Sequence, residues 1–444
     1  MGFNRKIINQ LNSWKTKEDR KPLVIRGARQ VGKTTVVTDF GKTFDHFISL
    51  NLEKPAHQRL FEGADSLEQI VNAIFLQSNT PRDNKPTLLF IDEIQESPTA
   101  IKQLRYFYEE FPSIHVIAAG SLLEFALKDV GSFPVGRVEQ LVLHPFDFEE
   151  FLMALGHDAA LGALNIIPFP DYAYNTLLQL FHTYTIIGGM PEVVKQYAKD
   201  GNMANLRPIY ESLWQGYKDD VKKYAQNRTE QNVIRHIMDT APGEKDRITF
   251  GGFGNSNYRS REVGEALRTL DKSRVIQLIY PTTATSAPIT ANLTRKPRLQ
   301  FLDTGLLNFA LGIQADMIAL RDMTDFHRGK IIQHMVVQQF QAQHTAPSFH
   351  PSFWVRDKAN SSAEVDLVFQ QGQRVIPLEV KSGAQGKLKS LHQFMNECDH
   401  SMAMRMLANN YSLEQAKTRE GKEFTLMNLP YFLAHKIPEY AGQF

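Results

Sequence analysis

The chain lacks the features that mark secreted, membrane-spanning or metal-stapled proteins. Its 444 residues include a single cysteine, Cys398, which excludes a disulfide framework and a cysteine-based zinc site. No apolar run approaches the roughly 20 residues that span a bilayer, and the amino terminus has no apolar signal core. These absences predict a cytoplasmic protein without a membrane-spanning part.

An excess of charge of one sign is also missing. The chain has 50 Lys and Arg against 48 Asp and Glu, for a formal net charge of +2. A protein this close to neutral has no overall field to attract nucleic acid, so any basic surface must be local. Apolar residues make up 42% of the chain, enough for buried cores in two to four domains.

One glycine-rich segment is the most informative part of the sequence. It has the G-x-x-x-x-G-K-[ST] spacing of a P-loop, with a strand-like run before it and a helix-like run after it. Glycines let backbone amides point into one concavity, which phosphate oxygens fill at the start of a helix. We predict that Lys33 reaches the terminal phosphates and that the Thr34 hydroxyl ligates Mg²⁺. The predicted ATP-binding residues are Gly27, Ala28, Arg29, Gln30, Val31, Gly32, Lys33, Thr34 and Thr35.

A second apolar run ends in two acids. Residues 87–91 read as a buried strand, and Asp92 and Glu93 follow at the end where parallel strands present their working groups. We predict that Asp92 holds the Mg²⁺ shell and that Glu93 orients and deprotonates the attacking water. An acidic pair alone is more often a solvated strand end, and the P-loop about sixty residues earlier is what favours the catalytic interpretation.

The chain divides into four predicted regions. Residues 1–150 alternate strand-like and helix-like segments, as in a parallel sheet with helices on both faces. Residues 151–227 are mostly helical and read as a lid or linker, residues 228–310 as a winged-helix-like region, and residues 311–444 as a mixed α/β domain. The strands predicted in the first region are Pro22–Gly27, His46–Glu53, Thr87–Glu93, His115–Ser121 and Glu139–Leu143.

Basic residues concentrate in the winged-helix-like region. A predicted helix at 260–270 precedes two strand-like segments, Val275–Tyr280 and Pro297–Phe301. Arginines on such a helix and on a basic hairpin can neutralise DNA phosphates, although an ordinary solvated face or a surface that docks on the ATPase remains an alternative. The predicted nucleic-acid contacts are Arg259, Arg261, Arg268, Lys272, Arg274, Arg295, Lys296 and Arg298.

Three residues near the carboxyl terminus have the spacing of a metal-dependent nuclease core. Asp366 lies on one predicted strand, and Glu379 and Lys381 lie on the next with their side chains on the same face. The two carboxylates could share a divalent metal while the lysine activates a water. Such cores usually add an acid from the preceding helix, where residues 329–340 offer only Gln333 and His334. A retained fold with a structural Lys–Glu pair is the alternative.

Together these segments resemble those of a bacterial and archaeal group of AAA-type ATPases. Its members carry a C-terminal domain of unknown function related to restriction-endonuclease-like folds. The resemblance spans nearly the whole chain. The stretches that carry it are Arg26–Thr34, Leu89–Gln95, Ala119–Ser121, Val135–Val138, Leu143–Phe146, Gly188–Glu192, Glu364–Asp366 and Glu379–Ser382.

The resemblance implies further roles. It implies an α/β fold in which an extra strand lies between the P-loop strand and the acidic strand, which places Ser121 beside the γ-phosphate as a sensor. Arg137 is implied to be an arginine finger or sensor arginine, with a structural salt bridge as the alternative. Gln333 stands where the group usually has Glu, a departure that weighs against nuclease activity.

The sequence thus predicts an ATP-driven switch that acts on or near nucleic acid through the winged helix and the C-terminal domain, with ATP and Mg²⁺ as cofactors. Two alternatives remain: a signalling or defence-type ATPase without a DNA client, and a metal-dependent nuclease regulated by ATP. The expected partners are ATP, DNA, and a second copy of the chain or another protein.

Overall fold

The computed structural model describes residues 3–63, 66–121, 123, 136–225, 227–244, 246–314, 325–358, 361–381 and 388–443. Val135 and Ser382, two residues of the resemblance, lie outside this part. The chain forms two compact units. The first consists of Met1–Pro145, Lys272–Arg274 and Thr345–Ser348, and the second of the remaining residues. Among the described helices, none is both long and apolar enough to cross a membrane.

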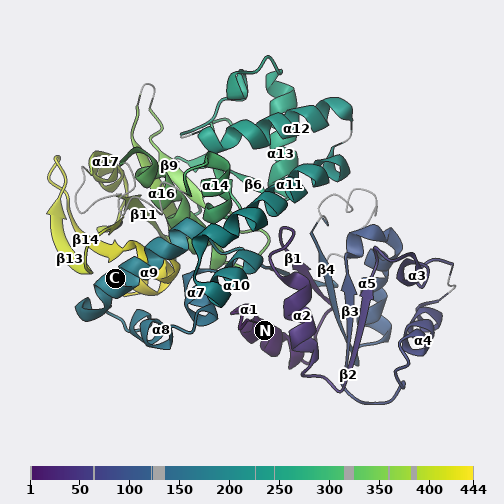
Figure 1. Ribbon diagram of the computed structural model, residues 1–444. Helices are drawn as coiled ribbons and strands as arrows, with labels where there is room; N and C mark the ends of the chain where they lie inside the picture. Colours follow the sequence, from purple (N-terminus) through teal and green to yellow (C-terminus); the bar gives the residue numbers. More distant parts are fainter. Residues whose placement is uncertain are drawn as a thin grey trace. The chain divides into compact units, whose positions relative to one another are not determined.

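A five-stranded parallel sheet forms the centre of the first unit, with strand order β2-β3-β4-β1-β5 (Figure 1). All four strand pairs are parallel, so the carboxyl ends of the strands share one edge. The strand β4 lies between the P-loop strand β1 and the acidic strand β3, which confirms the predicted extra strand. The strands are β1 (Leu23–Arg26), β2 (His46–Asn51), β3 (Thr87–Asp92), β4 (Ile114–Gly120) and β5 (Glu139–Val142).

Helices cover this sheet, as the alternating sequence predicts. Side chains alternate along β3, so Leu89 and Ile91 share one buried cluster with Ile70 of α4 and Leu104 of α5. The helix α5 begins where Ser97 accepts a hydrogen bond from the Ala100 amide, because a serine there satisfies an otherwise free donor. The helices of this unit are α1 (Ile7–Lys15), α2 (Lys33–Gly41), α3 (Pro55–Gln58), α4 (Leu67–Gln77) and α5 (Pro98–Glu110), with the 3₁₀ turn η1 (Ile94–Glu96).

The second unit begins with helices. They include the predicted mostly helical stretch and, after it, the two helices of the region expected to be winged-helix-like. The elements are α7 (Phe148–Ala154), α8 (Asp158–Leu164), η2 (Asp171–Ala173), α9 (Tyr174–Ile187), α10 (Pro191–Asp200), η3 (Met203–Leu206), α11 (Arg207–Tyr224), α12 (Arg228–Thr240), η4 (Ala241–Gly243), η5 (Phe253–Asn255) and α13 (Ser260–Lys272).

A seven-stranded mixed sheet follows, with strand order β13-β14-β12-β11-β10-β9-β7. Its strands are β7 (Pro281–Thr282), β9 (Ser352–Val355), β10 (Glu364–Gln371), β11 (Arg374–Val380), β12 (Met402–Leu407), β13 (Ser412–Lys417) and β14 (Glu423–Pro430). A separate antiparallel pair consists of β6 (Ile276–Ile279) and β8 (Arg298–Phe301). The remaining helices are α14 (Thr304–Leu311), α16 (Asp325–Ala342), α17 (Lys389–Glu397), η6 (Tyr431–Lys436) and α18 (Ile437–Ala441).

The short strand β7 connects two of the predicted regions. It lies in the connection between β6 and β8, yet it pairs with β9 in the larger sheet. Ile279 of β6 also packs in one cluster with Val337 of α16 and Phe353 of β9. Residues on both sides of the predicted boundary at 310 therefore share a sheet and a core. The main division between the two compact units falls at residue 145, close to the predicted boundary at 150.

A buried carboxylate organises the helical part of the second unit. Asp303 caps α14 by accepting a hydrogen bond from the Leu306 amide at 3.1 Å. It also accepts one from the Gly189 amide at 2.6 Å and one from Gln338 Nε2 at 3.2 Å. Burial raises the pKa of Asp303 to about 6, and the three donors oppose that rise. One side chain thus ties the break after α9 to both α14 and α16.

This arrangement requires glycine at position 188. Gly188 has φ +68°, and a Cβ added there would lie 2.1 Å from Asp303 Oδ1. Gly201 has φ +65°, but nothing lies within 4 Å of its added Cβ. Gly201 is in the left-handed helical region with ψ +7°, whereas Gly188 has ψ −165°, a conformation that essentially only glycine adopts. An alanine at position 188 therefore adds both greater backbone strain and steric overlap.

We therefore expect Gly188→Ala to lower the free energy of unfolding by roughly 2 kcal/mol more than Gly201→Ala. The added methyl group at position 188 displaces a carboxylate that three other donors hold in place. Chemical denaturation of both variants measures the difference. Equal losses would show that Asp303 does not enforce the conformation of this turn.

Candidate functional site

The predicted P-loop connects β1 to α2 at the carboxyl edge of the sheet. A Cβ on Gly27 would lie 2.4 Å from the Leu143 carbonyl oxygen, so the close approach of these two backbones requires glycine. Ala28 and Val31 are buried, while Gln30, Thr34 and Thr35 are exposed. Arg29 forms an ion pair with Glu53 at 3.5 Å. The loop thus has a packed inner side and an accessible outer side.

Lys33 folds back over this loop. Its ammonium donates hydrogen bonds to the carbonyl oxygens of Gly27 at 3.0 Å and Ala28 at 2.8 Å. Burial lowers the pKa of Lys33 to about 8, and the nearby Glu93 and Asp92 carboxylates oppose this decrease. The ammonium therefore stays mainly protonated at pH 7 and provides a positive charge at the start of α2, where the helix dipole also favours an anion.

The acidic pair lies beside the same helix start. The Thr34 hydroxyl donates to Asp92 Oδ2 at 2.7 Å, which joins the first turn of α2 to the end of β3. Burial raises the pKa of Asp92, and the hydrogen bond from Thr34 opposes the rise. Glu93 follows in a left-handed conformation with φ +51° and accepts a hydrogen bond from Gln95 Nε2 at 2.5 Å. A hydroxyl and a carboxylate this close are suitable oxygen ligands for Mg²⁺.

Ser121 lies at the tip of β4, between the ends of β1 and β3. It is buried, and its hydroxyl has no hydrogen-bond partner among the described residues. A buried polar group without a partner is costly in a native structure unless a ligand or water completes it. The position agrees with the sensor role that the resemblance implies, which remains a prediction.

Arg137 lies elsewhere in this unit. In the parallel register Glu139 pairs with Leu23 at the start of β1, whereas the P-loop follows Arg26 at the other end. Arg137 precedes β5 and forms an ion pair with Glu109 at 3.2 Å. It therefore lies at the edge of the sheet opposite the P-loop. This position does not favour contact with nucleotide bound by the same subunit. The ion pair with Glu109 agrees with the alternative of a structural salt bridge, and action across a subunit boundary stays a prediction.

The sequence interpretation missed a residue that braces the P-loop. Arg5 is buried and donates hydrogen bonds to the Val31 carbonyl oxygen at 3.0 Å and to the His144 carbonyl oxygen at 2.7 Å. It thereby connects the loop to the segment after β5. No sequence signal identifies this residue, because both acceptors are backbone atoms distant in the chain.

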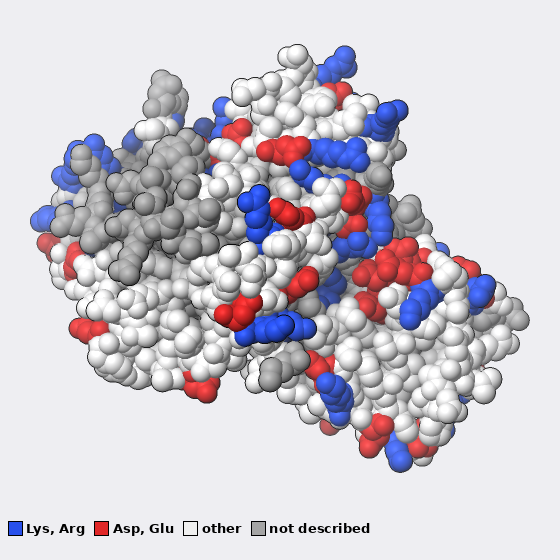
Figure 2. Space-filling view, viewed as in Figure 1, with Lys and Arg blue, Asp and Glu red and all other residues white. Residues whose placement is uncertain are grey.

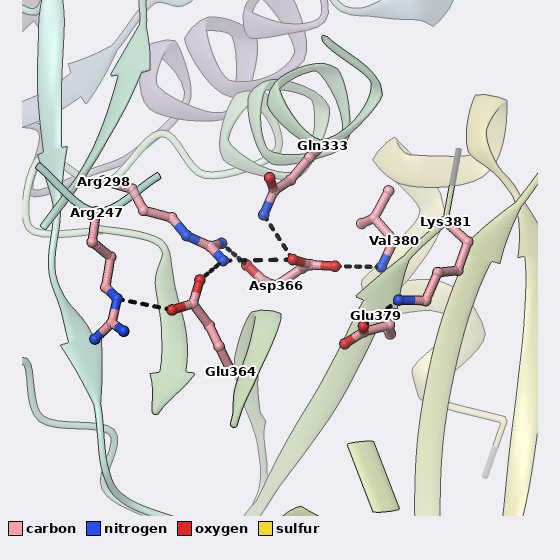
Figure 3. Close-up of polar contacts among 8 residues, drawn as sticks. All are labelled: Arg247, Arg298, Gln333, Glu364, Asp366, Glu379, Val380 and Lys381. Atoms are coloured by element: carbon pink, nitrogen blue, oxygen red, sulfur yellow. Dashed lines mark hydrogen bonds and ion pairs between the residues drawn. The ribbon is translucent and has the colours of Figure 1, made fainter. Parts of the chain in front are cut away.

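The three predicted residues of the second site also come together (Figure 3). Lys381 Nζ lies 2.6 Å from Glu379 Oε1, so the two side chains share a face as strand periodicity requires. Asp366 Oδ2 accepts a hydrogen bond from the Val380 amide at 2.8 Å, and Asp366 Oδ1 accepts one from Gln333 Nε2 at 2.8 Å. The amide of Gln333 thus occupies the place where an acid from the preceding helix was expected.

Two arginines complete this cluster. Arg298 of β8 forms an ion pair with Glu364 and lies 3.6 Å from Asp366 Oδ1. Arg247 Nε lies 3.0 Å from Glu364 Oε2. Figure 3 shows these arginines approaching the carboxylates of β10 from the side opposite Lys381. The sequence could have indicated that a cation is needed here. Glu364 and Asp366 lie two residues apart on one strand face, and their charges repel each other without a cation.

This geometry removes Arg298 from the predicted nucleic-acid contacts, because its guanidinium already pairs with two carboxylates. Arg295 pairs with Asp357 at 3.0 Å, and Arg261 with Glu265 at 2.8 Å. On the face that Figure 2 shows, Lys and Arg around α11 and α12 are interspersed with Asp and Glu. The residues that stay exposed are Arg259, Arg261, Arg268, Lys272 and Lys296, and Arg274 and Arg295 are partly buried.

Among the described residues, no group of three or more His, Cys, Asp or Glu side chains is placed to hold a metal ion. The shared metal predicted for Asp366 and Glu379 therefore has at most two side-chain ligands, and Arg298 stands beside one of them. The carboxylates of the second site are instead paired with the cations Arg247, Arg298 and Lys381.

Family models match three successive segments of the chain. Residues 19–152 match a model described as an AAA domain. This segment includes the P-loop, the acidic pair and the five-stranded sheet. The first unit contains an AAA P-loop ATPase domain. Residues 178–317 match a domain of unknown function, DUF8612, and residues 328–432 match another, DUF4143. No curated protein matches the chain.

The solved structures that are similar to parts of this chain include three of low sequence identity. The Walker-type ATPase PABY2304 of Pyrococcus abyssi is 14% identical, with 70% of this chain and 96% of that chain covered and a TM-score of 0.47. PCH-2 of C. elegans is 13% identical, with 45% and 64% covered and a TM-score of 0.29. Aeropyrum pernix ORC1 in complex with DNA is 14% identical, with 71% and 92% covered and a TM-score of 0.27. At these scores, none of the three informs the function of this chain.

The second site predicts a pH dependence of stability. Burial, followed by the charge of Asp366, raises the pKa of Glu379 to about 7 from a usual 4.5. A carboxyl whose pKa is raised by folding binds a proton in the native state before the unfolded chain does. Its contribution to stability is therefore largest below pH 4.5 and is lost as the pH rises to 7.

We expect Glu379→Gln to remove this loss, so the wild type should weaken relative to the variant by up to roughly 3 kcal/mol between pH 4.5 and 8. Denaturant unfolding at several pH values measures the difference in the free energy of unfolding between the two proteins. Asp303 is present in both, so its titration cancels in this difference. Glu423→Gln, at an exposed pair with Lys417, is the control and should follow the wild type. Parallel curves of stability against pH for wild type and Glu379→Gln would contradict the raised pKa of Glu379.

Proposed function

We propose that this protein hydrolyses ATP with Mg²⁺ and uses its nucleotide state as a conformational switch. The observation that carries the proposal is the link between Thr34 and Asp92 at 2.7 Å, beside the buried ammonium of Lys33. These groups would hold the β- and γ-phosphates and the metal ion. Bound Mg²⁺ would supply charge neutralisation, which the described residues fit because they offer a hydroxyl and a carboxylate.

Glu93 is the proposed general base. It follows β3 directly, and Gln95 holds its carboxylate at 2.5 Å from the amide nitrogen. A carboxylate in this position can orient a water and accept its proton. The unpartnered hydroxyl of Ser121 is the proposed sensor, since a phosphate oxygen would complete its hydrogen bonding. Arg137 is proposed to contact nucleotide only from a second copy of the chain.

We expect Glu93→Gln to keep ATP affinity and to lower turnover at least about 100-fold, because the amide cannot accept a proton. Calorimetry measures the binding and phosphate release measures the turnover. Glu96→Gln, three residues on, is the matched control and should behave as wild type. Lys33→Ala should lose the binding itself. Turnover retained in Glu93→Gln would place the base elsewhere.

For the second unit we propose a winged-helix-like module formed by α12, α13, β6 and β8, followed by a restriction-endonuclease-like domain. Val263, Leu267 and Leu270 of α13 are buried, which leaves Arg261 and Arg268 among its exposed residues, and Arg259 is exposed directly before the helix. We propose that this exposed face contacts nucleic acid through its phosphates. Phosphate contacts carry no sequence information, so binding through them should depend on salt rather than sequence.

We expect the triple variant Arg259→Glu, Arg261→Glu and Arg268→Glu to weaken DNA binding and to reduce the salt slope by up to about 3, roughly one for each lost phosphate contact. Fluorescence anisotropy over a salt series measures both effects. Arg207→Glu is the control, because Arg207 pairs with Glu211 on α11 as Arg261 pairs with Glu265. Unchanged affinity in the triple variant would favour a protein client instead.

A nuclease function is not favoured by the second site. Gln333 rather than an acid contacts Asp366, and Arg298 lies beside the same carboxylate. Among the described residues, no three carboxylate or imidazole groups there are placed to hold one metal ion together. We therefore propose ATP hydrolysis as the activity of this protein in the state described.

A further inference from the structure

The side chain of Arg29 reaches across the carboxyl edge of the sheet in the first unit. Arg29 lies in the P-loop after β1, and its guanidinium forms an ion pair with Glu53, which follows β2. In the strand order β2-β3-β4-β1-β5, the strands β4 and β3 lie between these two strands. The P-loop and the Arg29–Glu53 ion pair together therefore span the edge at which β4 and β3 end.

The same edge carries the two groups that are proposed to act on the γ-phosphate. Glu93 follows β3, and Ser121 follows β4 with a buried hydroxyl that has no hydrogen-bond partner among the described residues. The proposed base and the proposed sensor thus lie at the ends of the two strands that the Arg29–Glu53 ion pair spans. A cation at this edge is placed where negative charge develops when the terminal phosphate is cleaved.

The electrostatics of Lys33 agree with this placement of Arg29. Burial is the main cause that lowers the pKa of Lys33 to about 8, and the nearby positive charge of Arg29 adds to the decrease. The carboxylates of Glu93 and Asp92 act on the same ammonium in the opposite direction. Two cations and two acids therefore share one site, and both cations gain from an anion of several charges such as a triphosphate.

The ion pair between Arg29 and Glu53 is easily exchanged. Arg29 Nη2 and Glu53 Oε1 are 3.5 Å apart, and the two side chains are 27% and 45% exposed. An ion pair of this length and exposure contributes little, because water screens both charges. A guanidinium binds phosphate more strongly, through two parallel hydrogen bonds to a group of higher charge. Exchange of Glu53 for a phosphate also leaves the Glu53 carboxylate in solvent rather than buried without a cation.

The arginine to which the resemblance assigns a contact with nucleotide lies elsewhere. Arg137 precedes β5 at the opposite edge of the sheet, where its Nε lies 3.2 Å from Glu109 Oε1. Contact between Arg137 and nucleotide therefore requires a second copy of the chain. Arg29 belongs to the phosphate-binding loop itself, so its charge is present in every subunit that binds nucleotide.

We propose that Arg29 is a catalytic residue whose guanidinium exchanges Glu53 for the γ-phosphate of ATP in the same subunit and neutralises the charge that develops during cleavage. Water adds to the γ-phosphorus, and Glu93 accepts a proton from that water. The bond between the γ-phosphorus and the bridging oxygen breaks, and its electron pair leaves with ADP. Arg29 transfers no proton, because a guanidinium stays protonated. This inference rests on the ATP hydrolysis proposed above.

The test is ATP hydrolysis and nucleotide binding by the full-length Arg29→Ala variant. We expect kcat to fall at least about 100-fold while ATP affinity stays within about threefold of wild type, because the lost cation acts on charge that develops during cleavage. The variant should also lose the tight binding of ADP with aluminium fluoride, a mimic of the phosphoryl group in transfer, that wild type shows. Phosphate release measures turnover, and calorimetry measures both affinities.

Glu53→Gln separates a catalytic role of Arg29 from a bracing role. It weakens the same ion pair and keeps the guanidinium, so its turnover should be no lower than that of wild type. If Arg29 only held the P-loop to Glu53, Glu53→Gln would lose as much activity as Arg29→Ala, and the proposal would be overturned. Arg59→Ala, at an exposed arginine directly after α3, is the control for the loss of one positive charge and should behave as wild type.

The outcomes distinguish this inference from the proposed activity. A wild type that does not hydrolyse ATP would overturn both. A wild type that hydrolyses ATP beside an equally active Arg29→Ala would overturn the role of Arg29 alone. A fall in ATP affinity as large as the fall in turnover would also overturn it, since the arginine would then bind ATP without acting on its cleavage. Arg29→Gln, which keeps a hydrogen-bonding side chain without the charge, should show the same loss of turnover and covers the case in which Arg29→Ala does not fold.

Discussion

The need to pair buried charge governs both units of this protein. Lys33 is buried and lies against the carbonyl oxygens of its own loop with two carboxylates nearby. Arg298 is enclosed by Glu364 and Asp366, and Asp303 by three N–H donors. Each group would be costly to bury alone, because the desolvation of a charge exceeds what a single weak contact returns. The chain therefore brings distant segments together wherever such a group lies.

The two units apply this constraint in different ways. At the P-loop, the partners of Lys33 are backbone oxygens that a nucleotide can replace without leaving a charge buried and unpaired. The Thr34 hydroxyl and Asp92 are already in contact, so the two proposed ligands of Mg²⁺ lie together without it. At the second site, the cation comes from the protein itself. The first arrangement is open to a ligand, and the second is filled by Arg298.

Much of the ATPase domain was predictable from the sequence. The five strands predicted for it begin and end within two residues of those observed, and the strand between β1 and β3 is present. The strand positions are local features, because a short apolar run between turn residues admits few alternatives to a buried strand. The order of the strands was implied by the resemblance. The sequence left the role of Arg137 open, and the parallel register places this residue at the opposite edge of the sheet from the P-loop, where it pairs with Glu109. The pairing register of two strands that are distant in the chain cannot be inferred from the sequence of either strand alone.

The sequence alone determined where phosphate-binding and acidic residues occur, and that Glu379 and Lys381 share a face, since spacing and strand periodicity act over a few residues. Only the tertiary structure decided what those residues meet. It showed that Arg298 contacts carboxylates rather than solvent, that Gln333 contacts Asp366, and that Arg5 holds the P-loop. The physical reason is that a charge finds its partner through space, and the partner here lies from 26 to more than 60 residues away in the chain.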